Sequence, residues 1–281
     1  MPTDDPTPSP DAAAPDPSAD LAATLDALAP APPCGHGPRL FVGEADLGPA
    51  ALVTLDAPQA HYLRSVMRRG PGDAVVLFNG RDGEWLARLE AVAKAAATAR
   101  CTDQLRPQPD ADPDAAPWLL FAPLKRGPVD LLAEKATELG AARLQPVMTR
   151  FTTAARVNAT RLRAHAVEAA EQCRRLSVPQ VADPIPLPRV AEGWPAGRRL
   201  FVLAEHGRAV PATAAFAAAA DATAPAALLV GPEGGLADSE LDALAQLPFV
   251  TPVRLGPRIL RAETAAIAGL ALWQAVAGDW R

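Results

Sequence analysis

Residues 229–240, LVGPEGGLADSE, place three glycines, a proline and two glutamates directly after an apolar run. Gly231, Gly234 and Gly235 give the backbone freedom that a tight turn needs, or that a close approach to a ligand needs, because glycine has no Cβ. A second loop of similar character, LGPRILRAET at 255–264, follows the next apolar run. Ligands of open α/β sheets bind beyond the carboxyl ends of the strands. The two loops therefore predict two walls of one pocket.

The sequence around these loops alternates between two patterns from residue 118 onward. WLLFAP (118–123) is a continuous apolar run typical of a strand buried on both faces. GPVDLLAEKATELG (127–140) has Pro128 near its start and Gly140 as a stop, which favours a helix. Strand-like and helix-like segments continue to alternate as far as the last helix, ETAAIAGLALWQAVA (263–277). Residues 118–281 are thus predicted to form an α/β domain with a mainly parallel sheet.

Residues 39–105 have a different pattern. Short strand-like runs are separated by turn signals such as NGRDG (79–83), where Asn-Gly and Asp-Gly favour hairpins. A helix is predicted at 57–69. This part is predicted to be a small β-barrel, and the Pro- and Asp-rich residues 106–117 a linker.

The first 38 residues are rich in Pro, Ala and Asp and are predicted to be disordered. They hold six aspartates and no Lys or Arg, so that without them the net charge of −5 becomes +1. A nucleic-acid partner is therefore compatible with the folded part. The sequence has no signal peptide and no apolar run long enough to span a membrane, so we expect a cytoplasmic protein. Three distant cysteines and four scattered histidines lack metal-ligand spacing, and we expect no metal.

Several common catalytic and nucleotide-binding motifs are absent. The chain has no G-x-G-x-x-G in the first βα turn, no G-x-x-x-x-G-K-[ST] and no G-x-S-x-G. The residues by themselves favour a small polar ligand held by backbone groups, and they do not name it.

Five motifs together resemble one family. The glycine loop and the 255–264 loop, with their flanking strands and helices, are similar to the paired cofactor loops of the RsmE-type methyltransferases of the SPOUT superfamily. HYLRSVMRRGPGD (61–73), EKATELGAARLQPVMTRF (134–151) and EAAEQCRRLSVP (168–179) fit the same family. The resemblance covers about residues 39–277. Arg174 stands where the family often has glycine, and Arg175 where it has arginine.

The resemblance implies a PUA-like RNA-binding barrel followed by a SPOUT domain whose last segment threads a trefoil knot. It also implies a homodimer that uses S-adenosylmethionine to methylate N3 of a uridine in 16S ribosomal RNA, within the assembled 30S subunit. Uracil N3 lies on the pairing edge of the base, so the target must be unpaired or flipped out.

Family resemblance also assigns roles to residues. The implied cofactor-binding residues are Leu203, Glu205, Val230, Gly231, Pro232, Glu233, Gly234, Leu255, Gly256, Ile259, Leu260, Arg261 and Thr264. Arg261 and Arg175 are the candidate catalytic residues, since an arginine near O2 or O4 would stabilise the uracil anion. In the barrel, Arg39, Arg64, Arg68 and Arg69 are the candidate RNA contacts.

Other interpretations stay open. Glu263 and Thr264 could simply cap the last helix, and the two arginines at 174–175 could stabilise a helix end. The rival functions are a SPOUT methyltransferase acting on transfer RNA and a non-catalytic RNA-binding or ribosome assembly factor.

Overall fold

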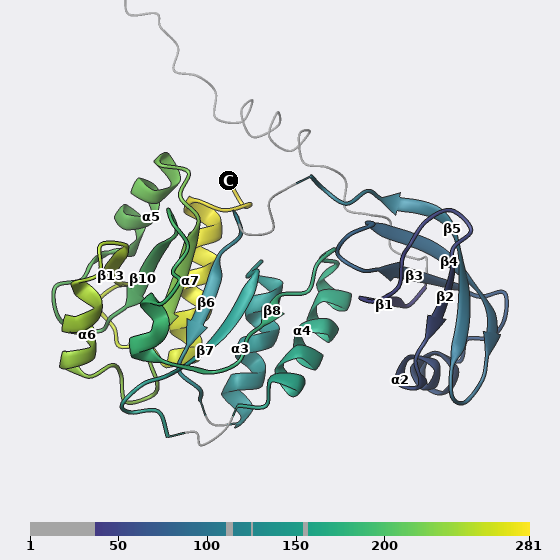
Figure 1. Ribbon diagram of the computed structural model, residues 1–281, viewed down its shortest axis with the longest axis horizontal. Coiled ribbons are helices and arrows are strands. Elements are labelled where there is room, and N and C mark those ends of the chain that lie inside the picture. Colours follow the sequence, from purple (N-terminus) through teal and green to yellow (C-terminus); the bar gives the residue numbers. More distant parts are fainter. Residues whose placement is uncertain (1–36, 111–114, 125, 154–156) are drawn as a thin grey trace, which may run out of the picture. The chain divides into compact units, whose positions relative to one another are not determined.

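The computed structural model describes residues 37–110, 115–124, 126–153 and 157–281 (Figure 1). The predicted disorder of residues 1–38 falls almost wholly outside these ranges, as does part of the predicted 106–117 linker. Within the described ranges, no helix has both the length and the apolar character that crossing a bilayer requires.

The first part is a five-stranded sheet. Its strands are β1 (Arg39–Phe41), β2 (Leu52–Leu55), β3 (Ala74–Phe78), β4 (Glu84–Val92) and β5 (Ala97–Arg106). Their order is β1-β3-β4-β5-β2, in which β1 and β3 are parallel and the other pairs antiparallel. Alternating apolar residues such as Val53, Leu55, Val75 and Leu77 fill its core.

The helix predicted at 57–69 is shorter than expected and changes its character. Asp56 and Gln59 form a reciprocal capping box that starts α2 (Ala57–His61). Residues Tyr62–Val66 (η1) then form a π-helical turn. Leu63 is fully buried in the core of the sheet, while Arg64 and Val66 are exposed. The buried Leu63 therefore fixes this turn to the sheet, while Arg64 and Val66 lie on the surface.

The second part is the predicted parallel α/β domain. Its elements are β6 (Trp118–Phe121), α3 (Arg126–Glu138), β7 (Arg143–Met148), α4 (Ala159–Cys173), β8 (Gln180–Val181), β9 (Ile185–Pro186), η3 (Leu187–Ala191), β10 (Arg199–Leu203), β11 (Val210–Pro211), α5 (Ala212–Asp221), β12 (Ala226–Val230), α6 (Asp238–Ala245), β13 (Val250–Arg254) and α7 (Ala262–Val276). The sheet order is β11-β13-β10-β12-β6-β7-β8, with β9 also paired to β7, and every pair is parallel.

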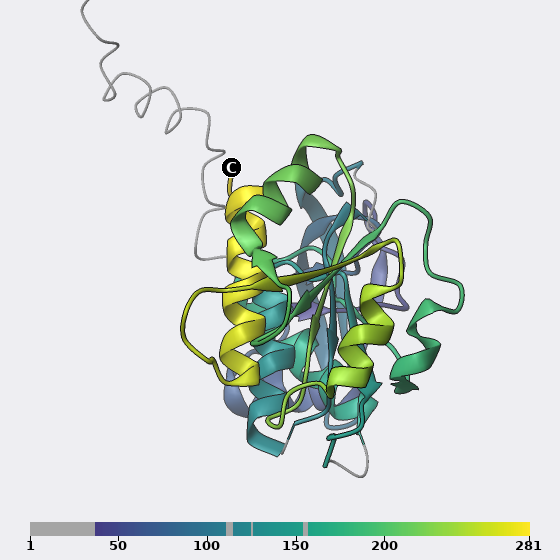
Figure 2. The ribbon, with the colours of Figure 1, turned by 90° about the vertical axis from the view of Figure 1, so that its left-hand side faces the viewer.

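Apolar side chains on alternate positions of the strands build a core on each face of this sheet. On one face, Leu119, Phe201 and Leu228 pack with α3, α4, α5 and α7. On the other face, Leu120, Val202 and Leu229 pack with η3 and α6. Figure 2 shows α7 and α3 on one side of the sheet and α6 on the other. Burial on both faces explains why β12, AALLV, is apolar throughout.

The helix boundaries agree with the stop signals of the sequence. Gly140, with a φ of +81°, follows the end of α3 as predicted. Arg174 occupies the equivalent left-handed position after α4, with a φ of +63°. This explains why glycine suits that position, because glycine adopts positive φ without steric cost. The knot that the resemblance implies stays a prediction.

Candidate functional site

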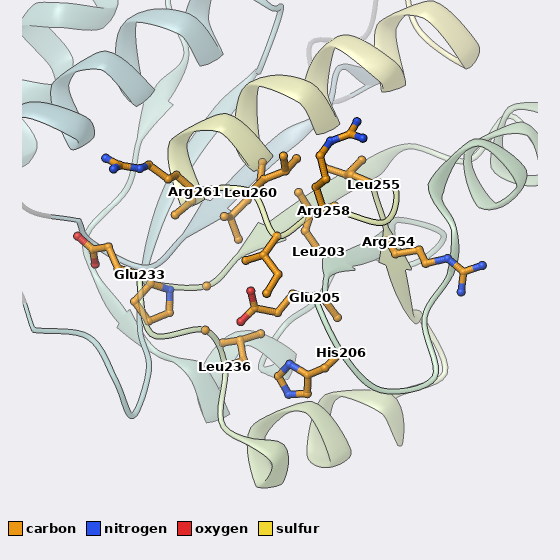
Figure 3. Close-up of a pocket in the computed structure, with 18 of the residues that line it drawn as sticks. Leu203, Glu205, His206, Glu233, Leu236, Arg254, Leu255, Arg258, Leu260 and Arg261 are labelled. Atoms are coloured by element: carbon orange, nitrogen blue, oxygen red, sulfur yellow. The ribbon is translucent and has the colours of Figure 1, made fainter.

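Three strands end side by side at the carboxyl edge of the parallel sheet. Leu203 at the end of β10 is paired with Val230 of β12 on one side and with Val253 of β13 on the other. The two glycine-containing loops thus leave strands that are not adjacent, because β10 lies between them. The sheet order brings the end of β10 to the centre of the site (Figure 3).

A cavity of about 680 Å³ opens at this edge. Its size is typical of a small-molecule site. It is lined by Pro128, Leu203, Ala204, Glu205, His206, Val230, Gly231, Pro232, Glu233, Gly235, Leu236, Leu241, Val253, Arg254, Leu255, Gly256, Pro257, Arg258, Ile259, Leu260, Arg261, Ala262, Glu263 and Ala265.

The glycines of the two loops serve both the turn and the cavity. A Cβ on Gly231 would lie 3.2 Å from Leu236 Cγ, and one on Gly235 would lie 2.8 Å from Glu205 Oε1. Gly235 also has a φ of +72°, which favours glycine. Gly256 has a φ of +122°, and a Cβ there would meet no atom within 4 Å. The first loop therefore needs glycine to close on itself, and Gly256 needs it for its positive φ although the space beside it is open.

The polar groups of the cavity have distinct orientations. Figure 3 shows the Glu205 carboxylate between the glycine loop and the Leu255–Arg261 loop, while Arg254, Arg258 and Arg261 extend outward. Arg254 donates a hydrogen bond of 3.0 Å to the carbonyl of Ala209. An acidic group thus lies within the cavity, and arginines lie at its rim. Within the described ranges, no group of three or more His, Cys, Asp and Glu side chains could hold a metal ion.

Comparisons with known proteins show the family of this chain. A family model described as an RNA methyltransferase domain matches residues 113–274, and one described as an RNA methyltransferase PUA domain matches residues 55–100. Ribosomal RNA small subunit methyltransferase E of Rickettsia conorii is 31% identical over 211 residues, which cover 75% of this chain and 84% of that protein. This chain belongs to the ribosomal RNA small subunit methyltransferase E family.

Two further relatives extend the match. The same enzyme of Synechocystis is 33% identical over 224 residues, covering 79% of this chain and 72% of that protein. The crystal structure of the enzyme from Neisseria gonorrhoeae, bound to S-adenosyl methionine, has a TM-score of 0.74 at 26% identity and covers 88% of this chain and 100% of that chain. Membership of the family makes this chain a methyltransferase of small-subunit ribosomal RNA, with the PUA domain that the resemblance implied followed by an RNA methyltransferase domain.

The cavity gathers most of the residues that the family resemblance suggested as cofactor contacts. Eleven of the thirteen line it, among them Arg261, and Gly234 and Thr264 do not. Gly234 lines a neighbouring hollow instead. Sequence reasoning missed His206 and Arg254, which directly adjoin predicted residues along the chain, and Leu236, which follows Gly235 in the glycine loop. It also missed Pro128 of α3, which the sequence marks only as the start of a helix and not as part of a binding site.

Arg175, the second catalytic candidate of the family resemblance, does not line this cavity. Its guanidinium donates hydrogen bonds of 2.8 Å to the carbonyls of Thr137 and Ala141, just at the end of α3. Burial lowers its pKa below the ordinary arginine value. These contacts tie the last turn of α3 to the residues that follow it, which is a structural role.

The four candidate RNA contacts of this family member lie in two settings. Arg39 donates to Glu84 at 2.5 Å and to the carbonyls of Ala170 and Arg175, and its side chain is 10% exposed. Arg64 and Arg68 are exposed at and after the π-helical turn, and Arg69 is half-buried. Arg39 therefore has structural partners. Arg64, Arg68 and Arg69 are the candidates for RNA contact that reach the surface.

Proposed function

We propose that this chain binds S-adenosylmethionine in the 680 Å³ cavity and methylates N3 of a uridine in 16S ribosomal RNA. The observation that carries the proposal is the convergence of both glycine-containing loops on the end of β10. Family membership supplies the substrate class, and the cavity supplies a place for the cofactor.

The residues of the cavity suit this cofactor. Leucines from two strand ends and the second loop, Leu203, Leu255 and Leu260, offer an apolar surface for an adenine ring. Glu205 offers a carboxylate to a cationic group, and the space beside the Cα of Gly256 is open. The bound cofactor would supply an electrophilic methyl group.

Arg261 is the catalytic residue of the proposal. It is exposed at the rim of the cavity, and it directly precedes α7. Methylation at N3 requires loss of the N3 proton, which leaves negative charge on the uracil. A guanidinium at the rim would stabilise that charge in the transition state. Arg175 is left out of the catalytic set because its guanidinium holds the end of α3.

RNA affinity is assigned to the exposed cations of the first part. Arg64 and Arg68 lie on and just after a segment whose Leu63 is buried in the core. Such an anchored surface would hold cations against the phosphate backbone.

A homodimer is proposed from α7 and α3. Ile267 and Ala271 of α7 are only partly buried, and Leu131 of α3 is 38% exposed. A second copy of the chain would cover these apolar residues. Sedimentation of a monomer at micromolar concentration would contradict this arrangement.

The decisive experiment incubates the full chain with methyl-labelled S-adenosylmethionine and small ribosomal subunits that lack the modification. Digestion to nucleosides and mass spectrometry should find labelled 3-methyluridine. Label in another nucleoside, or label only in added transfer RNA, would overturn the proposal. Cofactor binding without any transfer would favour a non-catalytic assembly factor.

A further inference from the structure

A second hollow adjoins the cavity, on the glycine loop. It measures about 550 Å³ and is lined by Arg150, Phe151, Thr152, Thr153, Glu233 and Gly234. Glu233 lines both hollows, so the two share one wall. Any group bound in the second hollow would therefore lie next to the proposed cofactor site.

Phe151 is the prominent residue of this hollow. Phe151 is 45% exposed, although burial of a phenylalanine side chain stabilises a folded protein. A Cβ built on Gly234 would lie 3.5 Å from Phe151 Cβ, so the phenylalanine already packs against the glycine loop. Single exposed apolar residues are common on proteins. At Phe151, however, the exposed ring lines a hollow, and hydrogen bonds fix the turn that carries it.

The turn that carries Phe151 is held at both ends. The backbone N–H of Thr149 donates to Oγ1 of Thr152 at 2.9 Å, and the N–H of Thr152 donates to the carbonyl of Thr149 at 3.2 Å. The two hydroxyls also lie 2.9 Å apart in a hydrogen bond. The N–H of Arg150 donates to Oε1 of Glu240 on α6 at 2.8 Å. Hydrogen bonds thus fix the backbone of the turn that carries the exposed Phe151 ring.

The groups around the ring match the chemistry of a nucleobase. The Arg150 guanidinium carbon lies 5.8 Å from the centre of the Phe151 ring, which places a cation beside an aromatic face. Aromatic faces stack with unpaired bases, and a nearby arginine neutralises phosphate. The Glu233 carboxylate at the shared wall is an acceptor for an N–H on the pairing edge of such a base.

We propose that the second hollow is the subsite of the flipped target base, with Phe151 as its stacking platform. The proposal rests on the proposed function, because a methyltransferase that modifies a base needs that base extruded beside its methyl donor. Phe151 acts as a substrate-positioning residue, and Arg150 as its phosphate contact.

The test compares three substitutions at Phe151 with a matched control. Phe151→Ala removes the ring, Phe151→Leu keeps only apolar volume, and Phe151→Trp restores an aromatic face. Trp280→Ala is the control, since Trp280 is also an exposed aromatic residue, at 59%, and lies in neither hollow. Steady-state rates are measured on unmodified small subunits at saturating S-adenosylmethionine, and cofactor affinity is measured by calorimetry without RNA.

Phe151→Ala and Phe151→Leu should lower kcat/KM for the subunits at least about tenfold, while Phe151→Trp and the control stay within about twofold of the unchanged protein. Cofactor affinity and melting temperature should not change in any variant. Equal rates for Phe151→Leu and Phe151→Trp would overturn stacking. A parallel loss of cofactor affinity would also overturn it, since Phe151 would then support only the glycine loop.

Failure of the two proposals would look different. If the unchanged protein forms no 3-methyluridine, the proposed function fails. If the unchanged protein forms it and Phe151→Ala does so at the same kcat/KM, the proposed function stands and the base subsite is refuted.

Discussion

The Arg39 guanidinium donates from Nε to Oε1 of Glu84 at 2.5 Å, and the Glu84 side chain is only 6% exposed. Arg106 donates to the other oxygen of the same carboxylate at 2.7 Å. Each arginine also donates to a backbone carbonyl at the end of α4, namely of Arg175 and Arg174. Glu84 therefore holds two guanidinium groups that cap the end of a helix.

Glu84→Gln should reduce the free energy of unfolding by about 3–5 kcal/mol at neutral pH, because it leaves two arginines without their buried counter-charge. Chemical denaturation of both proteins measures this difference. A loss below about 1 kcal/mol would mean that the cluster behaves like a surface ion pair.

The same substitution predicts a pH dependence. Burial raises the pKa of Glu84, and hydrogen bonds from Arg106 and Arg39 outweigh it, so that the pKa lies below its ordinary value. A carboxyl with a lowered folded pKa stabilises the protein above its unfolded pKa and loses this effect as the pH falls through the folded pKa. The stability difference between Glu84→Gln and the unchanged chain should therefore shrink in acid. A difference that is constant from pH 7 into that range would contradict the prediction.

The left-handed position after α4 predicts a substitution that separates backbone from side-chain effects. Arg174 has a φ of +63°. Arg174→Gly and Arg174→Ala remove the same side-chain contacts, and only glycine relieves the backbone. The free energy of unfolding of Arg174→Gly should therefore be about 1 kcal/mol higher than that of Arg174→Ala. Thermal melts of the two variants measure it, and identical stability would show that the position is relaxed.

Neighbouring glycines of the 231–235 loop should differ when each is replaced by alanine. Gly235 has a φ of +72°, and its Cβ would meet Glu205 Oε1, so Gly235→Ala should lose about 1 kcal/mol and weaken cofactor binding. Gly234 lacks a positive φ, and its Cβ would make ordinary contact with Phe151. Gly234→Ala should thus keep both the fold and the cofactor affinity. Calorimetry and thermal melts compare them, and equal effects would contradict the assignment of Gly234 to the second hollow.

Arg261→Ala should lower single-turnover rates by about a hundredfold or more and leave cofactor affinity within about threefold, because the charge acts mainly as the uracil anion forms. Arg208→Ala is the control, since Arg208 is exposed and does not line the cavity. Full turnover in Arg261→Ala would remove this arginine from the mechanism.

Charge reversal of both Arg64 and Arg68 should weaken RNA binding and reduce the slope of log K against log salt by about two. Cofactor affinity should not change. Arg189→Glu serves as the control, because Arg189 pairs with Glu192 on the exposed surface and lies outside the first part. Loss of cofactor binding in the double variant would show that the two parts do not divide the work.

Sequence patterns by themselves determined the classes of structure. The alternation of strand and helix segments predicted the parallel sheet, because apolar periodicity records which faces are buried. Gly140 predicted a helix end, since left-handed backbone is costly for any residue with a Cβ. The two cofactor loops were found from their glycines and from the family resemblance.

Only the tertiary structure decided which of these residues meet. The order β13-β10-β12 placed Leu203 between the two loops, and no local pattern encodes the order of strands in a sheet. The sequence offers Arg39 and Arg175 as site candidates just as it offers Arg64 and Arg261. In the structure, however, Arg39 donates to Glu84, and Arg175 donates to carbonyls at the end of α3. In the sequence, Phe151 is only the last residue of a family motif. The tertiary structure shows that it is exposed and lies next to Gly234. The physical reason is common to all three cases: a side chain acquires its role from partners that are distant along the chain.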